Sequence, residues 1–427
     1  MGEDAVPEAV TDPGRRETWD LAADPVLRAL PRREPRRFLL TLGEERLLVS
    51  TGDGVTSGVT VRSGVDINDS WAFAFSLSAE AWRGYRMPVP PAGHNTAQAL
   101  VATLGADVVS GDRLCWAQCS PVLERVLRVL AGKADTDGPR TAPTGERLDG
   151  PSRITGHYVP VTIAGETYRV YYETAGSGIP LVCLHTAGSD SRQYHHVMED
   201  ADLTDGFALY AFDLPWHGRS NPPADWRRRT YELDVAWYAE AVLAFMATLG
   251  LERPALLGCS MGGSLGLYLA SAHGEAFRAV VSLEGGFGNP SRRVAWTRQM
   301  EVDHSQFLST WVAGLMSPAS PQHLQDQVLW EYGQSGAGVY HGDTAFVATL
   351  PAVAADLGPT RCPLFVFCGE YDYSSTPEMS RTAAEQLGGR FTLLEGMGHF
   401  PMAEDPAAFR TYLAPVLDEI RASDQPV

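Results

Sequence analysis

One serine in this chain stands among glycines, within residues 256–263. Residues 258–262 read Gly-Cys-Ser-Met-Gly and fit the G-x-S-x-G pattern, in which a serine occupies a strained turn between a strand and a helix. The positions two before and two after the serine must be small, because strand and helix approach closely there. An apolar run at 254–257 leads into the turn, and a run of small residues and leucines at 264–272 leads out. This order predicts a nucleophilic Ser260; an ordinary glycine-rich turn is the alternative.

Three further residues with acid–base chemistry each follow an apolar run. Glu284 follows residues 279–283, Asp372 follows 364–368, and His399 follows 391–394. The carboxyl ends of parallel strands meet at one edge of a sheet, so these side chains are expected beside Ser260. A neutral imidazole can take the proton of a serine hydroxyl, and a carboxylate can orient that imidazole.

The elements that must position these residues alternate between strand and helix. Residues 158–163 and 168–172 predict a hairpin, and residues 231–249 an amphipathic helix. Further strands are expected at 181–184, 208–212, 255–258, 279–283, 364–368 and 391–394. Continuous apolar strands predict an α/β fold whose mostly parallel sheet carries helices on both faces. Residues 287–350 interrupt the series with aromatic, helical stretches, which predict a helical cap.

From about residue 153 onward the chain resembles the α/β-hydrolase family. The resemblance rests on the serine turn, the loop at 213–220, Gly-Glu-Tyr-Asp at 369–372 and Gly-Met-Gly-His-Phe-Pro at 396–401, in that order. It implies a triad in the order serine, acid, histidine. Ser260, Asp372 and His399 supply that order. Glu284 is the alternative acid, or otherwise a polar wall of the pocket.

The resemblance also implies an oxyanion hole built from two backbone N–H groups. Met261 supplies the first, and by position Ala187 is the expected second, with Thr186 the other choice. The family usually has His-Gly where this chain has His185 followed by Thr186, which brings a hydroxyl near the hole. His185 and His217 match structural, loop-fixing positions of the family. The residues expected to line the substrate pocket are Thr186, Gln193, Trp296 and Trp311.

The resemblance implies a serine-dependent hydrolase that cleaves an ester, thioester or lactone of a mostly apolar small molecule through an acyl-enzyme. A carbon–carbon bond hydrolase of a diketone-like substrate is one alternative. A non-hydrolytic lyase or cyclase, or a ligand-binding protein on the same scaffold, is another. No cofactor is expected. No metal site is expected either, because Cys115 and Cys119 lack a second ligand pair and the adjacent His195 and His196 point apart on a helix.

Ahead of the hydrolase-like part, residues 1–20 predict a tail, 21–132 a small α+β domain and 133–152 a polar linker to a domain at 153–427. A hairpin is expected at 37–49, a helix starting at Ser78, and a last strand at 108–116. The small domain resembles the sterol-carrier-protein-2-like fold in its alternating strand at 71–77, the helix start at 78–82 and the turn and strand at 105–112. This resemblance implies an apolar cavity for a lipid-like ligand; a module with a filled core is the alternative.

Charge and composition limit the partners of this protein. The chain carries 34 Lys and Arg against 52 Asp and Glu, a net charge of −18, which argues against nucleic acid. No apolar run reaches the length of a membrane span, and residues 1–20 lack the apolar core of a secretory signal. The six cysteines fit reduced thiols in a cytoplasmic protein. Homo-oligomerisation stays open.

Overall fold

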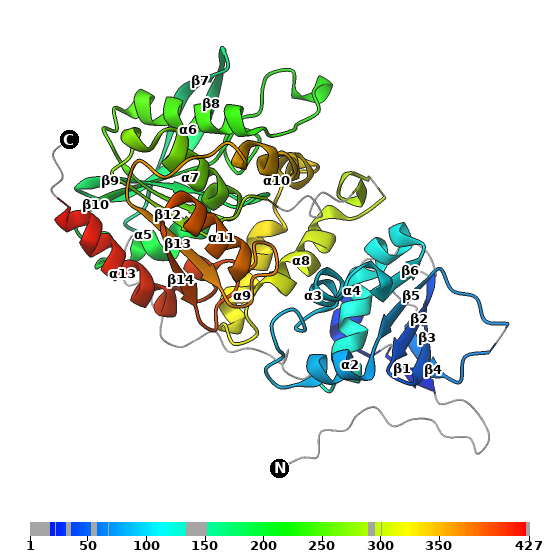
Figure 1. Cartoon of the computed structure of the whole chain (residues 1–427). Helices are drawn as coiled ribbons and strands as arrows, with labels where there is room; N and C mark the ends of the chain where they lie inside the picture. Colours follow the sequence, from blue (N-terminus) through cyan, green and yellow to red (C-terminus); the bar gives the residue numbers. More distant parts are fainter. Residues whose placement is uncertain are drawn as a thin grey trace. The chain divides into compact units, whose positions relative to one another are not determined.

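A computed structural model describes residues 18–21, 23–30, 36–52, 58–66, 68–133, 152–288, 295–299 and 301–423 (Figure 1). The chain divides into two compact units. The first combines residues 1–140 with 300–314, and the second combines 141–299 with 315–427. Most of the linker expected at 133–152 lies outside the described residues.

The first unit is built on a six-stranded sheet in the order β1-β4-β3-β2-β5-β6. Its strands are β1 (Thr18–Asp20), β2 (Arg36–Leu42), β3 (Glu45–Thr51), β4 (Val59–Ser63), β5 (Phe73–Leu77) and β6 (Val109–Gly111). Its helices are α1 (Pro25–Ala29), α2 (Ala79–Arg86), α3 (Ala97–Leu104) and α4 (Arg113–Leu130). The expected hairpin is the antiparallel pair β2–β3, and the Ser78 side chain accepts from Ala81 N at 3.1 Å to begin α2. The unit therefore has the α+β composition expected from the sequence.

Two local expectations for the first unit were wrong. Residues 18–20, assigned to the tail, form β1 and pair with β4. The strand expected at 108–116 stops in β6, and α4 starts directly after Asp112. Oδ1 of Asp112 accepts from the N–H groups of Leu114 (2.9 Å) and Cys115 (3.0 Å), which caps the first turn. A helix cap therefore overrides the β propensity of the apolar residues that follow.

The second unit contains an eight-stranded sheet in the order β14-β13-β12-β11-β9-β10-β8-β7. Its strands are β7 (Thr155–Ile163), β8 (Glu166–Gly176), β9 (Ile179–Leu184), β10 (Phe207–Phe212), β11 (Ala255–Cys259), β12 (Ala279–Leu283), β13 (Leu364–Gly369) and β14 (Arg390–Leu394). β8 pairs antiparallel with β7 and β10, and the remaining pairs from β10 to β14 are parallel. The expected mostly parallel sheet is confirmed.

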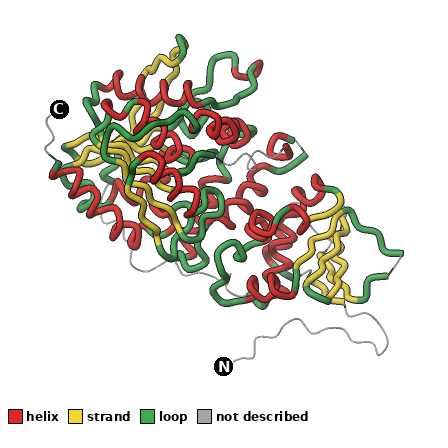
Figure 2. The backbone as a smooth tube through the Cα atoms, viewed as in Figure 1, coloured by secondary structure: helices red, strands yellow, loops and turns green. Residues whose placement is uncertain are grey.

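Helices cover both faces of this sheet (Figure 2). They are α5 (His195–Glu199), α6 (Val235–Leu249), α7 (Met261–Ala272), α11 (Pro377–Leu387), α12 (Pro401–Glu404) and α13 (Pro406–Ala422). Leu257 belongs to a buried cluster with residues of α5 and α13. Its neighbour Leu256 points to the opposite face, where Gly266 of α7 lies against it. The two-layer covering follows from this alternation of apolar side chains along a fully buried strand.

The region expected to form the cap contains α8 (His304–Leu315), α9 (Gln322–Tyr332) and α10 (Val339–Ala354). Residues of α8 up to Gly314 belong to the first unit, whereas α9 and α10 belong to the second. Asn95 Nδ2 donates to the carbonyl oxygen of Gly314 at 3.1 Å, and Gln118 Nε2 donates to that of Glu301 at 3.0 Å. The region expected to form the cap is therefore divided between the two units.

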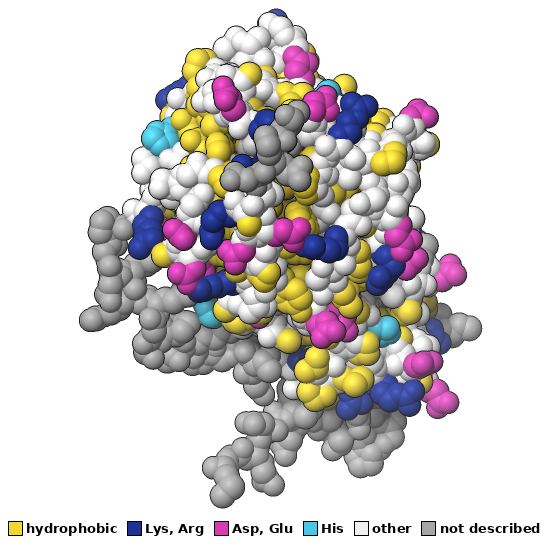
Figure 3. All heavy atoms as spheres, turned by 60° about the vertical axis from the view of Figure 1, so that its left-hand side comes forward, with side chains coloured by type: hydrophobic (Ala, Val, Ile, Leu, Met, Phe, Trp, Pro, Cys, Tyr) yellow, Lys and Arg dark blue, Asp and Glu magenta, His cyan; other side chains and the backbone are white. Residues whose placement is uncertain are grey.

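In the described part of the chain, no helix combines the length and apolarity that crossing a bilayer requires. The six cysteines are buried and carry free thiols. On the face drawn in Figure 3, Lys and Arg are interspersed with Asp and Glu instead of gathering into one basic patch.

A chain that begins at Arg153 is expected to fold, because the eight strands and their core lie within the second unit. In that truncated chain α8 lacks the first-unit residues that bind it, so chymotrypsin should cleave at Phe307 or Trp311 well before it does so in the full chain. Limited proteolysis with mass spectrometry, beside circular dichroism, measures both effects. An insoluble truncated chain, or equal protection of α8 in both chains, would contradict this domain division.

Candidate active site

Ser260 occupies the turn between β11 and α7 with φ 55° and ψ −111°, a strained backbone conformation for a residue with a side chain. Its N–H donates to the Leu283 carbonyl oxygen at 2.8 Å. A Cβ on Gly258 would lie 2.2 Å from the Gly262 oxygen, and a Cβ on Gly262 would lie 2.5 Å from that of Leu184. The expected strand–turn–helix order is therefore confirmed, together with the steric reason for its glycines.

His399 and Asp372 form a buried hydrogen-bonded pair. Nδ1 of His399 lies 2.7 Å from Oδ2 of Asp372, and both side chains are almost fully buried. Oδ1 of Asp372 accepts from the Ser374 N–H at 2.6 Å. A carboxylate only accepts, so the neutral ring carries its proton on Nδ1 and keeps the lone pair of Nε2 for a second partner. The sulfur of Cys259, next to the serine, contacts the His399 carbonyl oxygen at 3.3 Å, which joins the serine turn to the histidine loop.

Glu284 lies beside this pair, fully buried at the end of β12 with φ 53°. Both of its carboxyl oxygens lie 2.9 Å from the N–H of Gly369, and the carboxyl also hydrogen-bonds to Asp372. Burial, followed by the neighbouring charge of Asp372, raises the pKa of Glu284 well above its ordinary value. This shift favours the protonated form of Glu284, which can donate to Asp372, and the imidazole of His399 bonds to Asp372 and not to Glu284.

Glu284, Asp372 and His399 each offer a ligand atom, and these atoms lie within 4.8 Å of one another. A cation would have to compete with the proton on Nδ1 of His399 and with the proton on Glu284. Hydrogen bonds already join these three side chains into a chain that ends at the imidazole. We therefore interpret it as part of an acid–base site and not as a metal site.

The loop after β9 contains the expected second oxyanion donor, Ala187, which is 9% exposed. The Thr186 carbonyl oxygen accepts from Nδ1 of His185 (2.9 Å) and from the Ser189 N–H (3.2 Å). Met261 is the first residue of α7, so its N–H has no acceptor within the helix. The two predicted donors thus come from the start of α7 and from a loop in which hydrogen bonds hold the Thr186 carbonyl oxygen.

Hydrogen bonds between polar side chains connect this loop to the predicted cap region. Oε1 of Gln193 accepts from both the N–H and the hydroxyl of Thr186, each at 3.1 Å. The Thr186 hydroxyl also contacts the hydroxyl of Tyr332, the last residue of α9. Burial raises the pKa of Tyr332 well above its ordinary value, so its phenol stays protonated. Thr186 and Gln193, both predicted for the pocket, are brought together, and Tyr332 joins them.

For the other two residues predicted to line the pocket, that role stays a prediction. Trp311 lies on the part of α8 that belongs to the first unit. Trp296 lies in the short helix Ala295–Arg298, and its side chain lies outside the described part of the chain. Aromatic residues in a cap can serve its core or its pocket, and sequence alone does not distinguish these two uses.

Two of the buried carboxylates that the sequence reasoning did not single out bind the predicted site loops. Asp343 of α10 is fully buried and accepts from Gly188 N, His217 Nε2 and the Tyr231 hydroxyl. The signal was present, because it is the one carboxylate in the mostly apolar segment 339–354.

The second, Glu404 of α12, is also fully buried. It accepts from the N–H of Ser317 at 2.7 Å and from that of Phe400, next to His399, at 2.9 Å. Burial raises the pKa of Glu404 to about 7 despite these donors. Glu404 thereby ties the histidine loop to the segment that follows α8.

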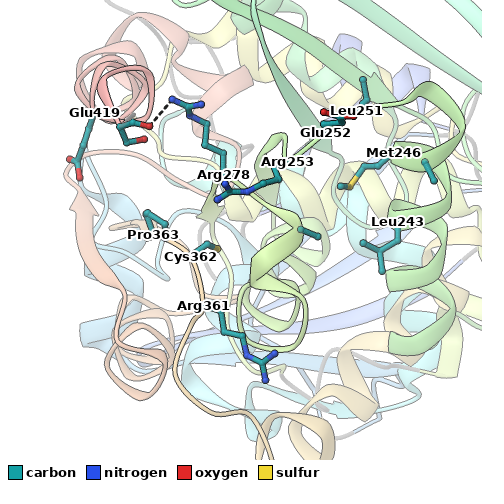
Figure 4. Close-up of a pocket in the computed structure, with 13 residues that line it drawn as sticks. Leu243, Met246, Leu251, Glu252, Arg253, Arg278, Arg361, Cys362, Pro363 and Glu419 are labelled. Atoms are coloured by element: carbon teal, nitrogen blue, oxygen red, sulfur yellow. Dashed lines mark hydrogen bonds between the residues drawn. The ribbon is translucent and has the colours of Figure 1, made fainter. Parts of the chain in front are cut away.

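A cavity of about 1170 Å³ lies at the opposite edge of the sheet (Figure 4). Arg253, Arg278 and Pro363 line it, and they lie one or two residues before β11, β12 and β13. The guanidinium of Arg278 is bound to the carbonyl oxygens of Ile420 (3.0 Å) and Ser423 (2.7 Å), which fixes the end of α13. This cavity is separate from the serine, which follows the carboxyl end of β11.

A family model described as the alpha/beta hydrolase family matches residues 181–411, more than half of the chain. The chain therefore belongs to the α/β-hydrolase family. An uncharacterized protein of Mycobacterium bovis is 24% identical over 269 residues, which cover 57% of this chain and 76% of that protein. A 2-hydroxy-6-oxononadienedioate/2-hydroxy-6-oxononatrienedioate hydrolase of Paraburkholderia phymatum is 31% identical over 143 residues, 33% of this chain and 48% of the relative.

Among solved structures, a thermophilic esterase from Thermogutta terrifontis is similar with a TM-score of 0.55 and 20% identity, over 62% of this chain and all of that one. The enol-lactonase from Burkholderia xenovorans LB400 gives a TM-score of 0.50 and 22% identity, over 61% of this chain and 100% of its own. At these identities the likeness shows the fold. Family membership, with hydrolases among the relatives, supports an enzyme of the hydrolase class.

We expect substitution of Asp372 and of Glu284 to lower kcat by different factors. Asp372→Asn should lower kcat by about 10³-fold or more, because an amide favours the wrong imidazole tautomer. Glu284→Gln replaces one neutral donor by another, so kcat should fall less than about tenfold. Steady-state kinetics on an activated ester, with thermal unfolding as the control for folding, ranks the two variants. A larger loss for Glu284→Gln would make Glu284 the acid of the triad.

Because the pKa of Glu404 is raised in the folded chain, we expect the free energy of unfolding to depend on pH. Its pKa is about 7 in the folded chain and about 4.5 when unfolded, so between these values the folded state holds the additional proton. Its contribution to the free energy of unfolding is therefore complete below about pH 4.5 and falls by up to about 3 kcal/mol as pH rises through 7. Urea unfolding of the wild type and Glu404→Gln at pH 5, 6, 7 and 8 isolates this term. A difference between them that is constant with pH would refute it.

Proposed function

We propose that this protein is a serine hydrolase that cleaves an ester, thioester or lactone of a mostly apolar small molecule through an acyl-enzyme. The hydrogen bond of 2.7 Å between His399 Nδ1 and Asp372, with Ser260 at a strained turn of φ 55°, carries the proposal. This hydrogen bond leaves Nε2 of His399 able to accept a proton at the edge of the sheet where Ser260 lies. Thr186, Gln193 and Tyr332 supply polar contacts beside the predicted oxyanion hole.

In the proposed acylation, Oγ of Ser260 attacks the substrate carbonyl carbon while Nε2 of His399 takes the hydroxyl proton. The carbonyl oxygen becomes an oxyanion, which the N–H groups of Met261 and Ala187 stabilise. The tetrahedral intermediate then expels the alcohol or thiol, which receives the proton from His399. Asp372 holds the ring and stabilises the imidazolium throughout.

Deacylation repeats these steps with water as the nucleophile. His399 takes a proton from water, the hydroxide adds to the acyl carbon, and the second tetrahedral intermediate releases the carboxylic acid. The proton on His399 returns to Oγ of Ser260, which restores the starting state. In this scheme Glu284 keeps its proton throughout and hydrogen-bonds to Asp372.

A second candidate is hydrolysis of a carbon–carbon bond in a diketone-like substrate. The 31% identity to the Paraburkholderia phymatum hydrolase over 143 residues favours keeping it. Parallel assays on an ester series and on 1,3-diketones distinguish the two, since the bond that breaks differs while the histidine and serine are shared.

The likeness of the first unit to sterol-carrier proteins stays a prediction, and that unit is proposed to affect substrate delivery and not the chemical step.

Ser260→Ala should lower kcat by several powers of ten, about 10⁴-fold or more, with little change in thermal stability because the glycines set the turn. A fluorophosphonate probe should label the wild type at this serine and leave the variant unlabelled. Mass spectrometry of the labelled peptide and assays with p-nitrophenyl acetate measure both effects.

Ser271→Ala is the matched control, because that hydroxyl lies at the far end of α7 and donates to the Gly358 carbonyl oxygen at 2.7 Å. It should keep full labelling. If the wild type takes up no probe, a lyase, a cyclase or a ligand-binding protein on this scaffold becomes the better hypothesis. A Ser260→Ala variant that keeps more than about a tenth of the activity would likewise exclude this nucleophile.

A further inference from the structure

One carboxylate of the predicted cap region binds the predicted oxyanion loop directly. Asp343 sits on α10 with no exposed surface. Its Oδ2 accepts from the Gly188 N–H at 2.7 Å and faces His217 Nε2 at 2.9 Å, while its Oδ1 accepts from the Tyr231 hydroxyl at 2.7 Å. We propose that Asp343 is a positioning residue through which the cap fixes the direction of the Ala187 N–H. This inference rests on the proposed function, because it assumes that Ala187 binds the oxyanion.

The first contact fixes the peptide that follows Ala187. The Gly188 N–H belongs to that peptide and donates to Asp343. Gly188 has φ 71°, and a Cβ there would lie 3.0 Å from Cδ2 of Tyr340. A glycine is therefore needed for α10 to approach the loop closely enough for this hydrogen bond.

The second contact fixes the charge of a histidine. Nδ1 of His217 lies 3.2 Å from the Pro215 carbonyl oxygen, which can only accept. Nε2 faces Oδ2 of Asp343, which already accepts from a backbone N–H. Both ring nitrogens therefore donate, and His217 is an imidazolium paired with a buried carboxylate. Burial opposes this charge, but Asp343 raises the pKa of His217 above its ordinary value.

The charge on His217 determines the state of the neighbouring His185, whose ring centre is 4.7 Å away. Nε2 of His185 accepts from the Leu214 N–H at 3.1 Å, so this ring is neutral and carries its proton on Nδ1. Burial and the positive charge of His217 lower the pKa of His185 to about 4, which agrees with that geometry. One ring of the pair is charged and the other is neutral because the carboxylate lies beside only one of them.

The neutral His185 fixes the peptide that precedes Ala187. Its Nδ1–H donates to the Thr186 carbonyl oxygen at 2.9 Å. In a trans peptide the carbonyl oxygen and the next N–H point in opposite directions, so holding the Thr186 oxygen aims the Ala187 N–H the other way. Asp343 thus acts on both peptides around Ala187: directly through Gly188, and indirectly through the two histidines.

The full-length wild type, Asp343→Ala and Asp343→Asn are compared on p-nitrophenyl acetate, with phenylboronic acid as a mimic of the tetrahedral intermediate. Asp343→Ala should lose about 100-fold in kcat with KM within about threefold, as expected when an oxyanion donor is misplaced. The boronate Ki should rise by the factor by which kcat falls. Asp343→Asn should recover part of the loss, because its amide oxygen can still accept from Gly188.

Glu331→Gln is the matched control. Glu331 is a buried carboxyl on α9 that accepts from Gln327 Nε2 at 3.2 Å and, within the described part of the chain, makes no hydrogen bond to the oxyanion loop. Its kcat and boronate Ki should stay within about twofold of the wild type, because no oxyanion donor depends on it. Thermal unfolding reports whether each variant is folded, and if Asp343→Ala does not fold, Asp343→Asn decides.

The inference is overturned if both Asp343 variants keep wild-type kcat, or if they change KM alone and leave the boronate affinity intact. Fluorophosphonate labelling of the wild type at Ser260 separates this failure from that of the proposed function. A labelled wild type with unaffected Asp343 variants rejects only the role of Asp343. An unlabelled wild type rejects the serine mechanism itself.

Discussion

The close approach of α7 to the sheet is the constraint on which the second unit depends. Three glycines permit it, since a Cβ on Gly258, Gly262 or Gly263 would lie 2.2 to 2.5 Å from a backbone oxygen. The approach forces Ser260 to φ 55° and directs the first N–H groups of α7 toward the edge of the sheet. A strained serine is tolerated because β11 is paired on both sides and fully buried.

Two acidic side chains are buried next to each other at that edge of the sheet. Glu284 and Asp372 lie together where two charges would repel, and the fold resolves this by keeping Glu284 protonated. Asp372 is then free to accept from His399, and two backbone N–H groups, those of Ser374 and Ser375, hold its other oxygen. One proton thus decides which carboxyl serves the imidazole.

The predicted cap region hydrogen-bonds to the two loops that carry the predicted site residues. Asp343 and Tyr332 reach from α10 and α9 to the loop after β9, and Glu404 ties the histidine loop to the chain that follows α8. Both predicted parts of the reaction centre, the oxyanion loop and the histidine loop, therefore depend on buried hydrogen bonds to the cap region. Such bonds stabilise one arrangement strongly, because an unpaired buried carboxylate is costly.

Sequence alone determined the features that follow from local sterics and periodicity. Alternating apolar runs predicted the strands of the parallel sheet, and the glycines around Ser260 predicted the strained turn. The end of β6 and the start of α4 were mistaken, because the Asp112 cap competes with an apolar run that by itself suits a strand. The three residues Ser260, Asp372 and His399 could be predicted because each lies at or within a few positions of the end of an apolar strand.

Tertiary structure decided what depends on partners distant in sequence. The assignment of α8 to the first unit rests on contacts such as Asn95 with Gly314, which are 219 positions apart. The protonation of Glu284 depends on its distance from Asp372, and the charge of His217 on a carboxylate 126 positions away. Local patterns report backbone geometry, whereas burial and hydrogen-bond partners arise only when the chain has folded, and these decide charge, protonation and the direction of a peptide.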